Sequence, residues 1–268
     1  MRNIITRTIT GAIFVSLIIC SLIFHPVILG IVTILLNYFS LIELNEMSRK
    51  FKIQTSNYWV LVNSFLVIIA IVLLNLGLSP AYAILPLLAI PVVLAASILF
   101  MEVASPVLYL VFALFNTLYI SLPLVLLNFI QLESLQMKIP FALAIFVVIW
   151  TNDTFAYLGG ISFGKHKMLK RVSPLKSWEG FLGGLIMVVP VLLIFNYFFP
   201  SFGIVSWIIF GLLTVIFGVT GDFLESLIKR GADIKDSGNL LPGHGGILDR
   251  IDSVLIAIPV IFIYLQFV

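Results

Sequence analysis

The sequence predicts an all-α, polytopic integral membrane protein with about nine transmembrane helices and a cytoplasmic N-terminus. Hydrophobic residues make up 61% of its 268 residues and charged residues only 10%, and the mean hydropathy is +1.20. Soluble domains carry roughly 25% charged residues, so this composition is typical of a membrane protein. Apolar runs near the ~20 residues that a helix needs to cross a bilayer recur from end to end. Helices are expected because open sheet edges cannot be satisfied in lipid and the alternating pattern of barrel strands is absent.

Nine apolar runs are the expected transmembrane spans. The first follows Arg2 and Arg7, and no small-residue cleavage site comes after it, so we expect an uncleaved helix rather than a signal peptide. Between residues 53 and 137 the charged side chains are Glu102 and Glu133, so this part should consist of membrane helices and short turns. The expected spans are residues 8–24, 27–43, 58–77, 81–100, 106–129, 139–158, 180–199, 204–224 and 253–268.

The distribution of Lys and Arg predicts the orientation. With the N-terminus in the cytoplasm, nine crossings place all fifteen of these residues except Lys138 on the cytoplasmic side. The positive-inside rule predicts such a bias, which supports both the number of spans and the orientation. The formal net charge of +3 is too small to indicate a nucleic-acid partner.

Acidic residues gather at the same expected membrane face. Asp153 and Asp222 lie near the cytoplasmic ends of the sixth and eighth spans, and Asp249 and Asp252 precede the ninth. A carboxylate at membrane depth costs a few kcal/mol, so it usually faces a polar cavity or a partner. A single such residue could form a structural ion pair, whereas four at one face predict a metal site.

The spacing of these acids supports the metal site. Asp249 and Asp252 are three residues apart, as are Asp222 and Glu225. The first pair shares one helix face if the last helix starts a turn before its apolar run. Clustered carboxylates suit Mg²⁺, which also binds substrate phosphates. The alternative is that Asp249 or Asp252 lies at a helix N-terminus, where negative charge is favourable.

A glycine-rich segment surrounds His244. Its glycines, among them Gly245 and Gly246, predict a compact loop whose backbone N–H groups can approach an anion, although an ordinary tight turn has the same pattern. His244 could be a general base, a phosphate donor or a structural residue. Nearby cations would hold phosphates while the acids hold the metal. These cations are Lys229, Arg230, Lys235 and Arg250.

A second basic segment follows the sixth span. Residues 159–166, GGISFGKH, fit the first part of a phosphate-binding P-loop, but His166 stands where Ser or Thr is needed, and a membrane helix precedes them. We therefore interpret this segment as a basic interfacial loop, and the cations that follow it, Lys170, Arg171 and Lys176, could attract anionic headgroups. Ser173 followed by Pro174 predicts the start of the next helix.

The stretch SLIKRGADIKDSGNLLPGHGGILDRID, residues 226–252, resembles the signature of phosphatidate cytidylyltransferases, also called CDP-diacylglycerol synthases. The stretches DTFAY from Asp153, FGK from Phe163 and SPLKSWEG from Ser173 are also similar to that family. This specific resemblance covers the C-terminal half of the chain. We therefore divide the chain into N-terminal transmembrane helices, 1–138, and a C-terminal catalytic transmembrane region, 139–268.

The resemblance implies transfer of CMP from CTP to phosphatidate, with release of pyrophosphate and formation of CDP-diacylglycerol. It further implies Mg²⁺, a second cation and a homodimer, with Asp222 and Asp249 as the leading metal ligands and Asp153 and Asp252 as further ones. The catalytic residues implied are Asp222, Asp249, Lys229, Arg230, Lys235 and His244. The substrate-binding residues implied are Ser173, Lys176, Asp236, Gly245, Gly246 and Arg250.

Two other functions fit parts of the pattern. A cytidylyltransferase for another lipid phosphate would have the same loop, because its lipid chains would meet the apolar helices. A transporter for an anionic solute would need polar residues near the bilayer midplane, whereas these acids gather at one edge. For the enzyme we expect the bilayer as partner, a bacterial inner membrane as location, and an active site that faces the cytoplasm.

Overall fold

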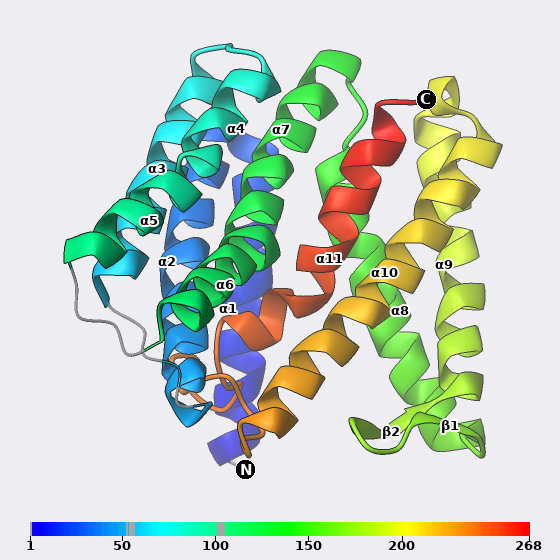
Figure 1. Cartoon of the computed structure of the whole chain (residues 1–268). Coiled ribbons are helices and arrows are strands. Elements are labelled where there is room, and N and C mark those ends of the chain that lie inside the picture. The colour runs from blue at the N-terminus through cyan, green and yellow to red at the C-terminus, as the bar shows by residue number, and fades with distance from the viewer. Residues whose placement is uncertain (1, 52, 54–56, 101–104) are drawn as a thin grey trace. The chain divides into compact units, whose positions relative to one another are not determined.

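The computed structural model describes residues 2–51, 53, 57–100 and 105–268, and nearly all of its regular structure is helical (Figure 1). One two-stranded antiparallel sheet interrupts the helices, so the predicted all-α class is confirmed with this single hairpin added in the described part. The elements are α1 (Arg2–Phe24), α2 (Pro26–Lys50), α3 (Asn57–Asn75), α4 (Pro80–Leu88), α5 (Ile90–Phe100), α6 (Pro106–Asn116), η1 (Thr117–Ser121), α7 (Leu122–Met137), α8 (Phe141–Phe163), β1 (Lys167–Leu169), β2 (Ser173–Ser177), α9 (Trp178–Phe198), η2 (Pro200–Phe202), α10 (Ile204–Gly231) and α11 (Leu248–Leu265).

Seven helical stretches among the described residues are long and apolar enough to cross a membrane. One of them is the continuous run Pro106–Met137, in which the π-helix η1 joins α6 to α7. These stretches identify a multi-pass membrane protein, as predicted. The number of nine crossings and the cytoplasmic N-terminus stay predictions.

The span predicted at residues 81–100 is wrong as a single helix. It is divided into α4 and α5 at Ala89. Pro91 has no backbone N–H, so the ladder of helical hydrogen bonds cannot continue unbroken through this point. The apolar composition alone did not reveal the break.

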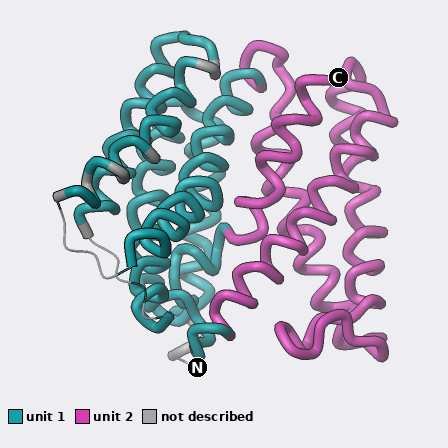
Figure 2. The backbone as a smooth tube through the Cα atoms, viewed as in Figure 1, with its two compact units in different colours: residues 1–133, 231–251 teal, residues 134–230, 252–268 magenta. Residues whose placement is uncertain are grey.

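The chain folds into two compact units (Figure 2). Unit 1 contains residues 1–133 and 231–251, and unit 2 contains residues 134–230 and 252–268. The segment 231–251, which follows α10, therefore belongs with the N-terminal helices. The functional division at residues 138 and 139 stays a prediction.

Hydrogen bonds between helices hold the apolar part of unit 1. The Ser121 hydroxyl of η1 lies 2.8 Å from Asn37 Oδ1 of α2 and 2.7 Å from Asn63 Oδ1 of α3. Asn63 also donates to Thr117 Oγ1 at 3.1 Å. Lipid is as apolar as a hydrophobic side chain, so polar contacts and close packing take over much of the association of membrane helices.

Close backbone packing organises unit 2. A Cβ atom at Gly180 of α9 would lie 2.5 Å from the carbonyl oxygen of Ala156 and 3.2 Å from the Cα atom of Gly160, both of α8, so α9 needs a glycine where the two helices cross. The sheet precedes α9, and Leu169 of β1 pairs with Ser173 of β2.

The helix start predicted at Ser173 is therefore wrong, because Ser173 begins a strand. Ser177 caps α9 instead, since its side chain accepts a hydrogen bond from the Gly180 N–H at 3.2 Å. The predicted loop at residues 159–166 is also shorter than expected, because α8 continues to Phe163.

Candidate active site

The crossing of α10 and α11 places two of the predicted acids in unit 2. A Cβ atom at Gly221 would overlap the carbonyl oxygen of Asp252 and lie 3.1 Å from the Cα atom of Ser253. Only glycine permits this approach. The next residue is Asp222, so the tight crossing positions Asp222 and Asp252 from neighbouring helices.

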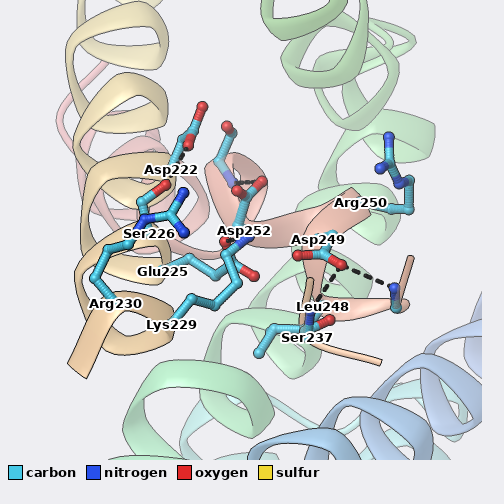
Figure 3. A network of polar contacts seen from close by, with 12 residues as sticks. Asp222, Glu225, Ser226, Lys229, Arg230, Ser237, Leu248, Asp249, Arg250 and Asp252 are labelled. Atoms are coloured by element: carbon cyan, nitrogen blue, oxygen red, sulfur yellow. Dashed lines mark hydrogen bonds and ion pairs between the residues drawn. The ribbon is translucent and has the colours of Figure 1, made fainter. Parts of the chain in front are cut away.

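Asp222 is paired with a cation and remains accessible. Its carboxylate forms an ion pair with Lys176 of β2, and the two side chains are 31% and 27% exposed. Ser226 donates to Asp222 Oδ1 at 3.3 Å, one helical turn further along α10 (Figure 3). The Lys176 ammonium also lies 4.4 Å from the centroid of the Phe223 ring. Lys176, predicted to bind substrate, thus contacts a predicted metal ligand.

Three carboxylates of unit 2 lie within electrostatic range of one another. Asp153 on α8 is exposed, whereas Asp252 on α11 is 9% exposed, and each experiences the negative charge of Asp222. Within the described ranges, no three His, Cys, Asp or Glu side chains are grouped closely enough to hold a metal ion by themselves. Mg²⁺ is usually bound by one or two carboxylates together with substrate phosphates, and this looser set fits that mode.

Lys229 and Arg230, both predicted to bind phosphate, have protein contacts at the end of α10. Lys229 forms an ion pair with Glu225 one turn earlier, and these side chains are only 12% and 1% exposed. Arg230 is exposed, and its Nε atom lies 3.5 Å from the carbonyl oxygen of Val172. Arg230 is therefore accessible to a phosphate, whereas Lys229 would have to leave Glu225.

The glycine-rich segment of unit 1 is a compact loop, as predicted. The Leu241 N–H donates to Gly245 O at 3.0 Å, and the His244 N–H donates to Leu241 O at 2.9 Å. Gly243 and Gly245 have φ angles of +78° and +85°, which favour glycine. Lys235 and Asp236, both predicted site residues, are exposed in the same segment.

Asp249 holds the two ends of this loop together. Its Oδ2 atom accepts hydrogen bonds from the Ser237 N–H at 2.9 Å and from the Gly246 N–H at 2.8 Å (Figure 3). A Cβ atom at Gly245 would lie 2.5 Å from the same oxygen. Because α11 begins at Leu248, Asp249 and Asp252 lie in one helix, so the condition for a shared face is met. The structure also contains the alternative, an acid at a helix N-terminus, and the metal role of Asp249 stays a prediction.

His244 faces the first helix of the chain. Its Nδ1 atom lies 2.6 Å from Thr10 Oγ1, and a Cβ atom at Gly11 would lie 3.3 Å from the imidazole. Burial, and then the positive charges of Arg250 and Arg7, lower the pKa of the His244 imidazole from its usual 6.5. His244 is therefore neutral at pH 7.

Arg250 completes the surface of the loop. It is exposed, and its guanidinium donates to the carbonyl oxygen of His244 at 2.6 Å. This hydrogen bond of the Arg250 guanidinium stabilises the loop. The geometry keeps a positive charge at the accessible side of the glycine-rich turn, where an anion could approach.

Two side chains that contact the loop were not predicted from the sequence. Thr10 was part of the first apolar run, and Glu43 closed the second. In the sequence Glu43 is an acid at the end of an apolar run, and this position is a signal that could have indicated a polar partner. In the structure its side chain is 5% exposed. The basic residues that follow Glu43 were attributed to membrane topology, so no partner in the C-terminal half was predicted for this acid.

Comparison with known proteins decides the family. The model described as "Cytidylyltransferase family" matches residues 5–268. The chain belongs to the cytidylyltransferase family. The match includes the N-terminal helices, so membership extends beyond the C-terminal half in which the sequence motifs lie.

Three bacterial proteins are similar to part of the chain. A protein of Haemophilus influenzae is 45% identical over 130 residues, which are 47% of this chain and 45% of that protein. A protein of Staphylococcus haemolyticus is 46% identical over 125 residues, 45% of this chain and 46% of its own length. One of Staphylococcus saprophyticus is 40% identical over 159 residues, 58% of each chain. Each is named phosphatidate cytidylyltransferase, and this chain spans about half the length of these relatives.

Proposed function

We propose that this protein is a phosphatidate cytidylyltransferase, a nucleotidyltransferase of phospholipid biosynthesis. It transfers CMP from CTP to phosphatidate and yields CDP-diacylglycerol and pyrophosphate. The observation that carries the proposal is the family match over residues 5–268, together with relatives that bear this name. The accessible Asp222–Lys176 pair and the basic glycine-rich loop supply chemistry that such a reaction needs.

The reaction is an in-line displacement at phosphorus. A phosphate oxygen of phosphatidate attacks the α-phosphorus of CTP, a new P–O bond forms, and the bond to the β-phosphate breaks as pyrophosphate leaves. Phosphatidate is already an anionic nucleophile, so no proton has to be removed from it. Catalysis then rests on positioning and on neutralising negative charge.

Basic and acidic residues have different roles in this reaction. Lys176, Arg230, Lys235 and Arg250 bind phosphate oxygens, and the backbone N–H groups of the glycine-rich loop orient them. His244, neutral at pH 7, contributes to the loop as a positioning group or hydrogen-bond donor. Asp222 and Asp249, with Asp153 and Asp252, would hold Mg²⁺ and a second cation. When bound, these ions neutralise the charge of the triphosphate and of the leaving pyrophosphate.

The membrane setting follows from the charge distribution. We infer nine crossings with the N-terminus and the active site on the cytoplasmic side, because this arrangement places the Lys and Arg residues inside with Lys138 as the exception. A bacterial inner membrane supplies the lipid substrate, and bacterial relatives support this location. We further propose that the protein works as a homodimer.

A direct assay tests the proposal. The purified protein is incubated with CTP labelled in the cytosine ring, phosphatidate vesicles and Mg²⁺, and the organic phase is counted. We expect a labelled lipid and one pyrophosphate per turnover. A label that stays in the aqueous phase would refute the proposal. In a parallel assay with vesicles of an ether-lipid phosphate, label that enters only this second lipid would favour the alternative acceptor.

A further inference from the structure

A buried acid of the second helix is bonded to the glycine-rich loop of unit 1. Glu43 lies near the C-terminal end of α2 and is 5% exposed. Its Oε2 atom accepts hydrogen bonds from Ser237 Oγ at 2.8 Å and from the Leu248 N–H at 2.9 Å. Its Oε1 atom accepts one from the Ile247 N–H at 2.8 Å. Each of these bonds joins α2 to a residue about two hundred positions away in the sequence.

The donors explain why a carboxylate can be buried here. A buried charge is costly unless hydrogen bonds compensate it. Ile247 and Leu248 lie at the start of α11, where backbone N–H groups have no partner within the helix and where the helix dipole favours a negative charge. Glu43 therefore caps α11 from another helix. An apolar residue at this position would leave those N–H groups without Glu43 as their acceptor.

Two glycines of the loop lie in close contact with the Glu43 side chain. A Cβ atom at Gly238 would lie 2.8 Å from Glu43 Oε1. A Cβ atom at Gly246 would overlap both Glu43 Oε2 and Ser237 Oγ. These two glycines are thus required by close approach to a protein carboxylate, in addition to any approach of a phosphate.

Glu43 and Asp249 hold the same residues from two sides. Ser237 donates its N–H to Asp249 and its hydroxyl to Glu43. Gly246 donates its N–H to Asp249, and the next two residues donate theirs to Glu43. The position of the Asp249 carboxylate is consequently tied to α2 through both ends of the loop.

We propose that Glu43 is a positioning residue for the reaction: it fixes the glycine-rich loop and thereby the orientation of Asp249 and of the loop N–H groups. The effect on turnover rests on the proposed function, whereas the effect on the loop does not. Glu43 touches no substrate and acts through Ser237, Ile247 and Leu248.

The test compares three variants of Glu43 with a matched control on the same helix. Glu43→Gln puts an amide donor against backbone donors, and Glu43→Ala removes every contact. We expect both to lower kcat/KM for CTP by about 10²-fold, the cost of a displacement near 1 Å in an active site. Glu43→Asp keeps an acceptor and should retain more activity than either. The control, Glu46→Gln, changes an exposed acid one turn later and should stay within about two-fold of the parent.

A second readout reports on the loop without any turnover. A nitroxide label is attached to Asn239→Cys, an exposed loop position, in a background with Cys20→Ser. We expect Glu43→Gln to increase the mobility of the label and Glu46→Gln to leave it unchanged. An unchanged label spectrum in a folded Glu43→Gln protein would overturn the proposal. If the parent protein makes no cytidine lipid, the proposed function fails, but the label still decides the role of Glu43.

A milder variant covers the case in which the Glu43 variants do not fold. Ser237→Ala removes one hydroxyl and leaves the two N–H bonds to Glu43 in place. It should lower kcat/KM by about ten-fold, the usual effect of one hydrogen bond to a charged group, and raise the mobility of the label. Combined with Glu43→Asp, its effect should be less than additive, since both act on one contact. Full activity and an unchanged label in Ser237→Ala would count against the proposal.

Discussion

The acids of unit 1 and the acids of unit 2 have different surroundings. In unit 1, Glu43 and Asp249 accept hydrogen bonds from backbone N–H groups and shape the loop. In unit 2, Asp222 faces the ammonium group of Lys176 and is 31% exposed. An acid that is bonded to the backbone must affect folding of its loop, whereas an accessible acid paired with a mobile cation can change partners. Substitution of an acidic residue should therefore change the structure of the loop in unit 1, whereas in unit 2 it should change mainly turnover.

The largest effect is expected at Asp222. Asp222→Asn removes the charge that pairs with Lys176 and that we propose as a metal ligand, and turnover should fall by roughly 10²–10³-fold. Thermal stability should change little because the carboxylate is partly exposed. Lipid-product formation and thermal unfolding in detergent measure the two quantities.

An exposed acid of unit 1 provides the control for Asp222. Asp233 is exposed and has a φ angle of +55°, a conformation that Asn also tolerates. Asp233→Asn should therefore leave both turnover and stability unchanged. Full turnover in Asp222→Asn would remove Asp222 from the site.

A smaller but more informative effect is expected from a pair of variants at Asp249. In Asp249→Asn the side-chain oxygen can still accept from Ser237 and Gly246, whereas Asp249→Ala removes both bonds. If Asp249 is also a metal ligand, Asn should lower turnover by more than about 10²-fold with a nearly normal loop, since loss of an outer-shell partner alone costs about 10–100-fold. Ala should lower turnover and also increase loop mobility. An active Asn variant beside an inactive Ala variant would mean that Asp249 serves the loop alone.

The smallest effect concerns pH and His244. Its pKa is lowered in the folded state, so protons bind preferentially to the unfolded chain. The contribution of His244 to stability is complete above the unfolded pKa of about 6.5 and is lost as the pH falls through the folded pKa. The side chain is partly exposed, which keeps this effect small. Thermal unfolding followed between about pH 8 and 5 should show a loss that is reduced in His244→Gln, and equal pH profiles would contradict the assignment.

Local patterns in the sequence predicted the features that depend on neighbours along the chain. The apolar runs predicted most helices, and the glycines predicted the turn around His244. These local patterns gave wrong predictions where tertiary contacts determine the structure. Pairing between β1 and β2 moved the helix start from Ser173 to Ser177.

The contact between Glu43 and the loop could not be predicted from spacing. Its partners lie 194, 204 and 205 residues away, and no local period connects them. Gly246 was among the glycines expected to let backbone N–H groups approach an anion, whereas in the structure the Glu43 carboxylate lies close to both Gly238 and Gly246. The one signal in the sequence for this contact was the position of an acid at the end of an apolar run.

The most direct test of this account is the conversion of cytosine-labelled CTP into lipid by the purified protein and by its Asp222→Asn variant. With phosphatidate and Mg²⁺, the account predicts that the parent protein moves the label into the organic phase and that the variant nearly fails to do so. A parent protein that leaves the label in the aqueous phase, or a variant that matches the parent, would contradict it.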